Sequence, residues 1–220
     1  MPADSTQPSK RLLEPYERVS EVLFGLIMVL TFTGSLSVAE ANRAEVRTML
    51  IGALGCNVAW GIIDGILYLM GCVSEKGRGI RSLRALRNAA APEIAHRVIA
   101  DSLPPLVAAT LGPTEYEGIR RKLMALPAPP AHPRVSKQEW FEAFAVFLWV
   151  FLSTLPVAVP FIFMRDVGQA LRLSNAIAIV LLFVTGFAFG RAAEYRPLPT
   201  GFAMVLLGSL LVGLTMMMGG

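Results

Sequence analysis

One carboxylate in this sequence stands where it could do chemistry inside a membrane. Asp64 lies in residues 49–73, MLIGALGCNVAWGIIDGILYLMGCV, a run that is otherwise free of charged residues. A spanning helix needs about 20 apolar residues, so the run is long enough to cross a bilayer. An ionised carboxyl group near its middle costs at least about 2.5 kcal/mol and commonly faces a partner, a cavity or an ion path. We therefore expect Asp64 to face the protein interior and not lipid.

Other polar residues share the helical face of Asp64. Asn57, Gly61, Asp64 and Tyr68 follow a 4-3-4 spacing, which is that of one face of a helix. A glycine on this face favours close packing against a second helix. Two interpretations stay open, because the face could line an ion path or could form a buried hydrogen-bond network that only joins helices.

The preceding apolar run, residues 19–39, carries two further candidates on one face, Glu21 and Met28. Glu21 lies near one end of the run, so it could take part in an ion path or simply reach water. Met28 lies near the middle of the membrane, where a methionine commonly serves only as apolar filling.

A polar segment, residues 74–138, offers a possible metal site. Glu93 and His96 are three residues apart on a predicted helix, within reach of one metal ion. The residues that could add ligands are Asp101, Glu115, Glu117 and His132. Two ligands at helical spacing are a weak signal, and a solvated polar face is the simpler interpretation.

The elements that must position these residues are membrane helices. The chain has 220 residues, of which 54% are hydrophobic and only 16% charged, whereas soluble domains carry about 25% charged residues. The hydrophobic runs predict an all-α, polytopic membrane protein with five transmembrane helices at 19–39, 49–73, 140–163, 175–191 and 201–219. The predicted parts are 1–73 with the first two helices, a small helical insert at 74–138, and 139–220 with the last three helices.

The insert is the only part that is large enough to fold in water. Residues 79–103 have a helical period, and residues 114–126 predict a second helix in which Thr114 and Glu117 have the spacing of a capping box. Residues 127–134, PAPPAHPR, predict an extended connector.

Positive charge predicts the orientation. Sixteen of the 20 Lys and Arg residues lie before the first span, in the insert or after the fourth span, which all face the same side. By the positive-inside rule the N-terminus and the insert are cytoplasmic and the C-terminus is external. Topology therefore explains the net charge of +4, and we expect no nucleic-acid partner. The predicted spans contain no histidine and no nucleophile with a base in reach, so we expect no enzyme.

Several motifs resemble the vacuolar iron transporter family, which also includes manganese-exporting bacterial members. The helix order with its cytoplasmic insert is similar. The similar motifs are RVSEVLFGL in the first span, the two-proline LPVAVPF in the third, ALRLSNAIAIVLLFVTGFAFG in the fourth and GFAMVLLGSLLVGLTMMMGG in the fifth.

The chain also departs from that family. The family's first span reads FGLNDGL with an Asp on the ion path, whereas this chain reads FGLIMVL and has Met28 there. In the second span Asp64 stands where the family has a Met, so a carboxylate and a thioether would be exchanged between the two helices. The family's insert is rich in Glu and Met, whereas this insert is rich in Arg.

The resemblance implies an exporter of a divalent transition-metal cation, Fe²⁺ or Mn²⁺, from the cytosol in exchange for protons. It implies a homodimer in the lipid bilayer, without a resident cofactor. Sixteen Arg against four Lys favour a bacterial source and hence the inner membrane. Asp64 would bind the ion or carry a proton, and Asn57, Met28 and Glu21 would line the path. The alternative is a scaffold or regulatory partner that has lost transport, which the loss of the first-span Asp favours.

Overall fold

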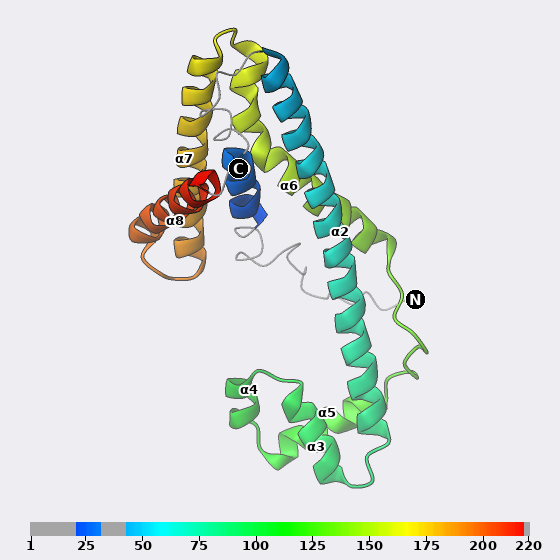
Figure 1. Ribbon diagram of the computed structural model, residues 1–220. Coiled ribbons are helices and arrows are strands. Elements are labelled where there is room, and N and C mark those ends of the chain that lie inside the picture. Colours follow the sequence, from blue (N-terminus) through cyan, green and yellow to red (C-terminus); the bar gives the residue numbers. More distant parts are fainter. Residues whose placement is uncertain (1–20, 32–42, 218–220) are drawn as a thin grey trace. The chain divides into compact units, whose positions relative to one another are not determined.

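The computed structural model describes residues 21–31 and 43–217, and its regular structure over these residues is entirely helical (Figure 1). The predicted all-α class is therefore confirmed. After a first helix, Glu21–Thr31, come α2 Arg43–Arg87, α3 Pro92–Asp101, α4 Pro105–Thr110, α5 Pro113–Met124, α6 Lys137–Phe163, α7 Val167–Ala192 and α8 Pro197–Met217. The residues form two compact units: Leu67–Trp140, and the described residues on either side of it.

Within residues 21–31 and 43–217, four helices are long and apolar enough to cross a membrane: Val46–Arg87, Lys137–Phe163, Val167–Ala192 and Pro197–Leu214. They coincide with four of the five predicted spans. The first predicted span, 19–39, is described only over Glu21–Thr31, a shorter apolar helix. Its remaining residues lie outside the described part of the chain, so the count of five stays a prediction.

Apolar side chains from three helices form the centre of the membrane unit. Leu26 and Leu30 of the first helix pack with Val157 of α6 and with Ala178 and Leu182 of α7. The Ser174 hydroxyl of α7 donates to the carbonyl oxygen of Val157 over 2.7 Å, so a polar bond reinforces the same contact.

Glycines let α7 and α8 approach closely. A Cβ atom on Gly186 would lie 2.6 Å from Met204 Cγ and 2.8 Å from the carbonyl oxygen of Thr200. This small-residue packing is typical of membrane helices, where van der Waals contact replaces the hydrophobic drive of a soluble core.

The second helix is longer than the sequence predicted. The span at 49–73 was expected to be followed by a separate helix at 79–103, but α2 is one helix over Arg43–Arg87, and the chain breaks only before α3. The break before α3 is explained by Pro92, which lacks an N–H group and is tolerated only in the first turn of a helix. Ala91 before it is extended, with φ −141° and ψ 150°, as the residue before a proline prefers.

The other unit is a small helical cluster around the end of α2. Leu86 of α2 is buried with Ala95 and Ile99 of α3, and Tyr116 and Ile119 of α5 pack against them. The predicted capping box was placed two residues too late. Glu115, not Glu117, closes it by accepting from the Gly112 N–H over 2.9 Å, because Pro113 occupies the first helical position and makes Gly112 the N-cap.

Cationic side chains of α2 bind the connector that follows α5. Arg84 Nη2 donates to the carbonyl oxygens of Pro130 at 2.8 Å and Ala131 at 3.0 Å. Arg87 Nη2 donates to the carbonyl oxygens of Leu126 and Pro127. Lys76 Nζ donates to the carbonyl oxygen of Arg134 at 2.8 Å and also pairs with Glu139. The extended connector is therefore attached to the helix by its own carbonyl groups.

Candidate functional site

Two carboxyl groups from different helices meet in the membrane unit. Asp64 of α2 is 6% exposed, as expected from the cost of placing its charge in lipid. Its electrostatic neighbour is Glu21 of the first helix, which is held by Trp60, one helical turn before Asp64. Within the described residues, Asp64 Oδ2 has no hydrogen-bond partner. Two ionised carboxylates side by side repel each other strongly, so such a pair favours holding a proton or a cation.

Trp60 holds Glu21 beside Asp64. Its indole Nε1 donates to Glu21 Oε2 over 3.2 Å, and its ring centroid lies 5.7 Å from that of Phe24. Trp60 precedes Asp64 by one helical turn, so two successive turns of α2 face the Glu21 side chain. Trp60 was not among the predicted site residues, although its i, i+4 spacing to Asp64 places it on the same helical face.

Asn57 is 1% exposed and bonds to α6. Its Nδ2 donates to the carbonyl oxygen of Phe151 over 3.1 Å and to the Thr154 hydroxyl. Its Oδ1 is buried and has no partner among the residues that the structure describes. The Phe151 carbonyl can only accept, which fixes the orientation of the amide. The amide nitrogen thus joins α2 to α6, whereas the amide oxygen meets no donor in the described part of the chain.

The buried face of α2 matches the prediction for Asn57, Gly61 and Asp64. A Cβ atom on Gly61 would lie 2.9 Å from the Phe147 ring of α6, and one on Gly65 would lie 3.1 Å from the Ala143 carbonyl oxygen. The glycines therefore let α6 approach on the face that carries the polar residues.

Met28 has an apolar environment. It is partly buried against the cluster around Leu26, Val157 and Leu182. It lies seven residues beyond Glu21, which corresponds to about 10 Å along a helix axis. The hypothesis that Met28 and Asp64 share a site stays a prediction, and the neighbour that the structure gives Asp64 is Glu21.

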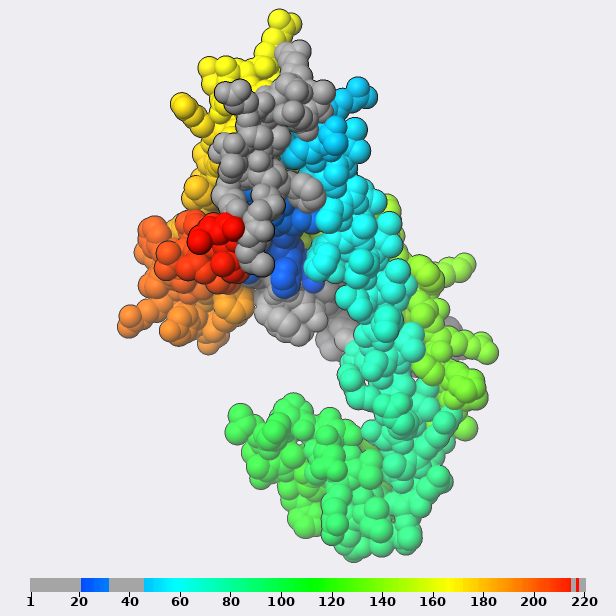
Figure 2. All heavy atoms as spheres, in the orientation of Figure 1, coloured from blue at the N-terminus to red at the C-terminus, as the bar shows by residue number. Residues whose placement is uncertain are grey.

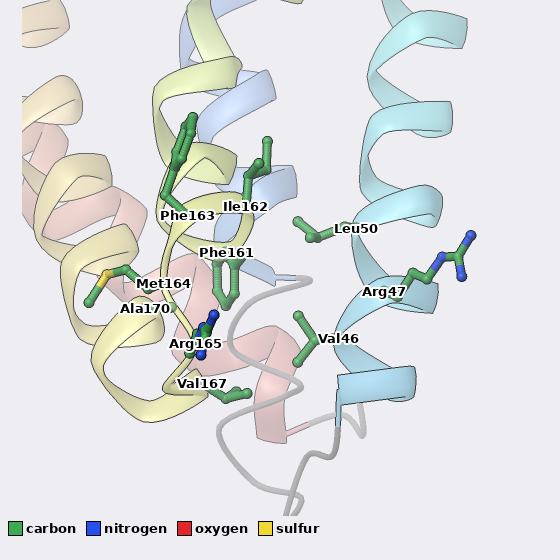
Figure 3. Close-up of a pocket in the computed structure, with 10 residues that line it drawn as sticks. All are labelled: Val46, Arg47, Leu50, Phe161, Ile162, Phe163, Met164, Arg165, Val167 and Ala170. Atoms are coloured by element: carbon green, nitrogen blue, oxygen red, sulfur yellow. The ribbon is translucent and has the colours of Figure 1, made fainter.

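Two hollows with lining residues in common lie between α2 and α6. The larger, of about 450 Å³, lies between the start of α2 and the end of α6. In Figure 3 Val46 and Leu50 of α2 point towards Phe161, whereas Arg47 points away. The smaller hollow shares Leu50 and Phe161 with it and is also lined by Asn57 and Thr154.

Glu117 of the insert is contacted by a histidine and an arginine. His96 Nε2 lies 3.3 Å from Glu117 Oε2, and Arg120 donates to both Glu117 oxygens at 2.8 and 2.9 Å. The Arg120 hydrogen bond, aided by His96, lowers the pKa of Glu117 to about 2. Glu93 is exposed on α3. No three His, Cys, Asp or Glu side chains in the described part of the chain are grouped to hold a metal, so the Glu93–His96 metal site stays a prediction.

A comparison with known families identifies the protein. A model of the VIT family matches residues 93–220, which is more than half of the chain. The chain belongs to this family, the vacuolar iron transporters. Membership agrees with the resemblance seen in the motifs of the last three spans. A search of curated proteins found no match to the chain.

VIT family members are membrane transporters of metal ions and not enzymes. Together with the apolar helices, membership makes this chain an integral membrane protein. The family match begins in α3 and so does not extend to Glu21, Asn57 or Asp64. The carboxyl pair therefore has to be judged on its own geometry.

Proposed function

We propose that the protein exports a divalent transition-metal cation, Fe²⁺ or Mn²⁺, from the cytosol in exchange for protons. The observation that carries this proposal is the buried Asp64 next to the partly buried Glu21, in a chain whose family transports metal ions. A carboxyl pair can release protons when a cation binds and take them up when it leaves. One site can then couple the two fluxes.

The ligand types suit a borderline cation. Carboxylate oxygens bind Fe²⁺ and Mn²⁺ well, and Asn57 and Met28 would line the rest of the path with an amide and a thioether. Ca²⁺ prefers six to eight oxygen ligands, so a path that includes a thioether disfavours it.

The proposed setting follows from charge and from exposed apolar surface. The insert and the N-terminus would be cytoplasmic and the C-terminus external, in a bacterial inner membrane. Figure 2 shows side chains that project from the surface of the chain. In α6 the aromatic residues Phe141 and Trp149 are 71% and 50% exposed. Lipid or a second copy in the expected homodimer would cover them.

The test is metal flux in proteoliposomes. Purified protein is reconstituted, and uptake of ⁵⁵Fe²⁺ or ⁵⁴Mn²⁺ is followed with and without a pH gradient. We expect flux of at least one of the two metals above empty vesicles, and faster flux when protons can move in the opposite direction. Metal flux that is equally fast with and without the pH gradient would contradict proton exchange.

The proposed orientation is tested by cysteine labelling, with single cysteines introduced into a variant that lacks Cys56 and Cys72. A reagent added from outside should label a cysteine at position 220 and spare one at position 128.

The alternative is a transport-inactive scaffold or regulatory partner. It is favoured by Met28 at the position of the family's ion-path Asp and by a family match that starts only at residue 93. A folded, correctly inserted protein without flux of either metal would support this alternative over transport.

A further inference from the structure

We propose that Asn57 and Thr154 form a second, uncharged station for the transported cation, separate from the Glu21–Asp64 pair, and that Met49, two turns earlier on α2 in the same hollow, holds a soft cation on its way there. This inference rests on the proposed transport function and adds to it a binding site and a basis for selectivity. Thr154 and Met49 had no functional role in the sequence analysis.

The first step is that the amide oxygen of Asn57 is buried and has no donor among the described residues. The side chain is almost completely buried, and the two hydrogen bonds of its Nδ2 turn Oδ1 away from Phe151 and Thr154. A buried carbonyl oxygen without a donor costs about 1–3 kcal/mol. A cation bound to it would remove that cost.

The second step is the donor set around the same hollow. Thr154 Oγ1 donates to the Phe151 carbonyl oxygen over 3.1 Å and accepts from Asn57, so one lone pair remains for a further ligand. Met49 and Asn57 lie eight residues apart on α2 and line the same hollow. Eight residues correspond to about 12 Å along the helix axis. The hollow thus offers an amide and a hydroxyl oxygen together, and a thioether sulfur about two turns away.

The third step is size. The hollow has a volume of about 10 Å³, close to the minimum that holds a single water molecule. Its remaining walls are apolar, including Val29, Ala53 and Phe161. A cation with its full hydration shell does not fit, so the ion must enter partly dehydrated and take protein ligands instead.

The fourth step is the relation to the carboxyl pair. Asn57 and Asp64 are seven residues apart on one helix, or about 10 Å along its axis. Conduction needs binding that is strong enough to capture an ion and weak enough to release it. A charged site followed by a neutral site meets both needs, and the thioether selects softer cations over Ca²⁺ and Mg²⁺.

The test uses Cd²⁺, a thioether-seeking probe, as a competitor of ⁵⁴Mn²⁺ flux in proteoliposomes. Met49→Leu keeps the side-chain volume and removes sulfur, and we expect about tenfold weaker inhibition by Cd²⁺. Met70→Leu is the matched control, because Met70 lies on the same helix but is 61% exposed; it should behave as the wild type. Equal Cd²⁺ inhibition in all three proteins would overturn the thioether assignment.

Thr154→Val and Thr154→Ser test the hydroxyl ligand. Valine keeps the methyl group that packs near Gly25, and we expect flux to fall about tenfold. Serine restores the hydroxyl and should restore most of the flux, which a purely packing role would not predict. Wild-type flux in Thr154→Val, with unchanged cation preference, would contradict a role for Thr154 in the station.

The outcome remains separable from the transport proposal. If the wild type carries no metal, Cd²⁺ binding to the detergent-solubilised protein is measured by calorimetry instead. One bound Cd²⁺ that is lost in Met49→Leu and kept in Met70→Leu would support the station although transport had failed. Identical binding in both variants would reject it.

Discussion

The two stretches of α2 hold their neighbours in opposite ways. Up to Ile66 the helix packs through glycines, which have no side chain. Gly61 and Gly65 let the α6 backbone and the Phe147 ring approach to contact distance. From Leu67 onward it uses long cationic side chains: Arg84 and Arg87 reach out to carbonyl oxygens of the connector. One continuous helix therefore contacts its neighbours by close packing in one stretch and by hydrogen bonds from arginines in the other.

The difference follows from the two solvents. Lipid is as apolar as leucine, so helices in it gain from close van der Waals contact and from a few buried polar bonds. In water a guanidinium remains partly hydrated while it donates several hydrogen bonds, so its desolvation costs little. This contrast also accounts for part of the insert's departure from a Glu- and Met-rich composition, because several of its basic residues support the fold.

The largest expected effect comes from filling a glycine contact. Gly61→Leu should destabilise the protein by about 2–3 kcal/mol, because overpacking of a tight contact costs amounts of this order. Gly55→Leu, on the same helix, is the matched control, since among the described residues no atom from another part of the chain lies within 4 Å of its added Cβ. The midpoint of thermal unfolding in micelles should fall by several degrees for Gly61→Leu alone. Equal midpoints would show that α2 and α6 do not pack closely here.

The next effect concerns the connector. Replacing Arg84 and Arg87 together by Gln should speed protease cleavage within residues 126–134 about fivefold, as expected for the loss of about 1 kcal/mol. Arg81→Gln is the control, because Arg81 is exposed on the same helix. Cleavage rates are followed by mass spectrometry. If the double variant resists the protease as the control does, the arginines do not hold the connector.

The smallest effect is a pH dependence in the insert. The folded-state pKa of Glu117 is lowered from 4.5 to about 2, so its ion pairs stabilise the insert above about pH 4.5. Their contribution should be lost as the pH falls towards 2. Thermal unfolding followed by circular dichroism should show this loss in the wild type, and a flatter profile in Glu117→Gln. Parallel profiles would mean that Glu117 contributes no pH-dependent stability.

The sequence predicted features that are set within a single helix, such as its length and its buried face. Apolar length located the spans, and the 4-3-4 spacing found the buried face of Asn57, Gly61 and Asp64. It could not find Trp60, Thr154 or Met49 as partners, because contacts between helices depend on their register and not on periodicity. It also ended α2 too early, since the charged residues 75–87 mark the end of an apolar run but do not stop a helix.

The central claim is that Glu21 and Asp64 together form the coupling site. Two groups of one site should not act independently. Glu21→Gln and Asp64→Asn should each lower the metal flux, and the flux of the double variant should be only slightly below that of the less active single variant. Flux losses that multiply in the double variant would place the two groups in separate sites.

The most direct test is Asp64→Asn measured as ⁵⁴Mn²⁺ and ⁵⁵Fe²⁺ flux in proteoliposomes. Asparagine keeps the shape and one acceptor but removes the charge that offsets cation dehydration. Asp166→Asn is the matched control, because Asp166 caps α7 and Asn is an equally good cap. We predict that Asp64→Asn loses at least about tenfold in flux, as the removal of a charged ligand implies, while Asp166→Asn transports like the wild type. Equal flux in both variants, with transport intact in the wild type, would contradict the account.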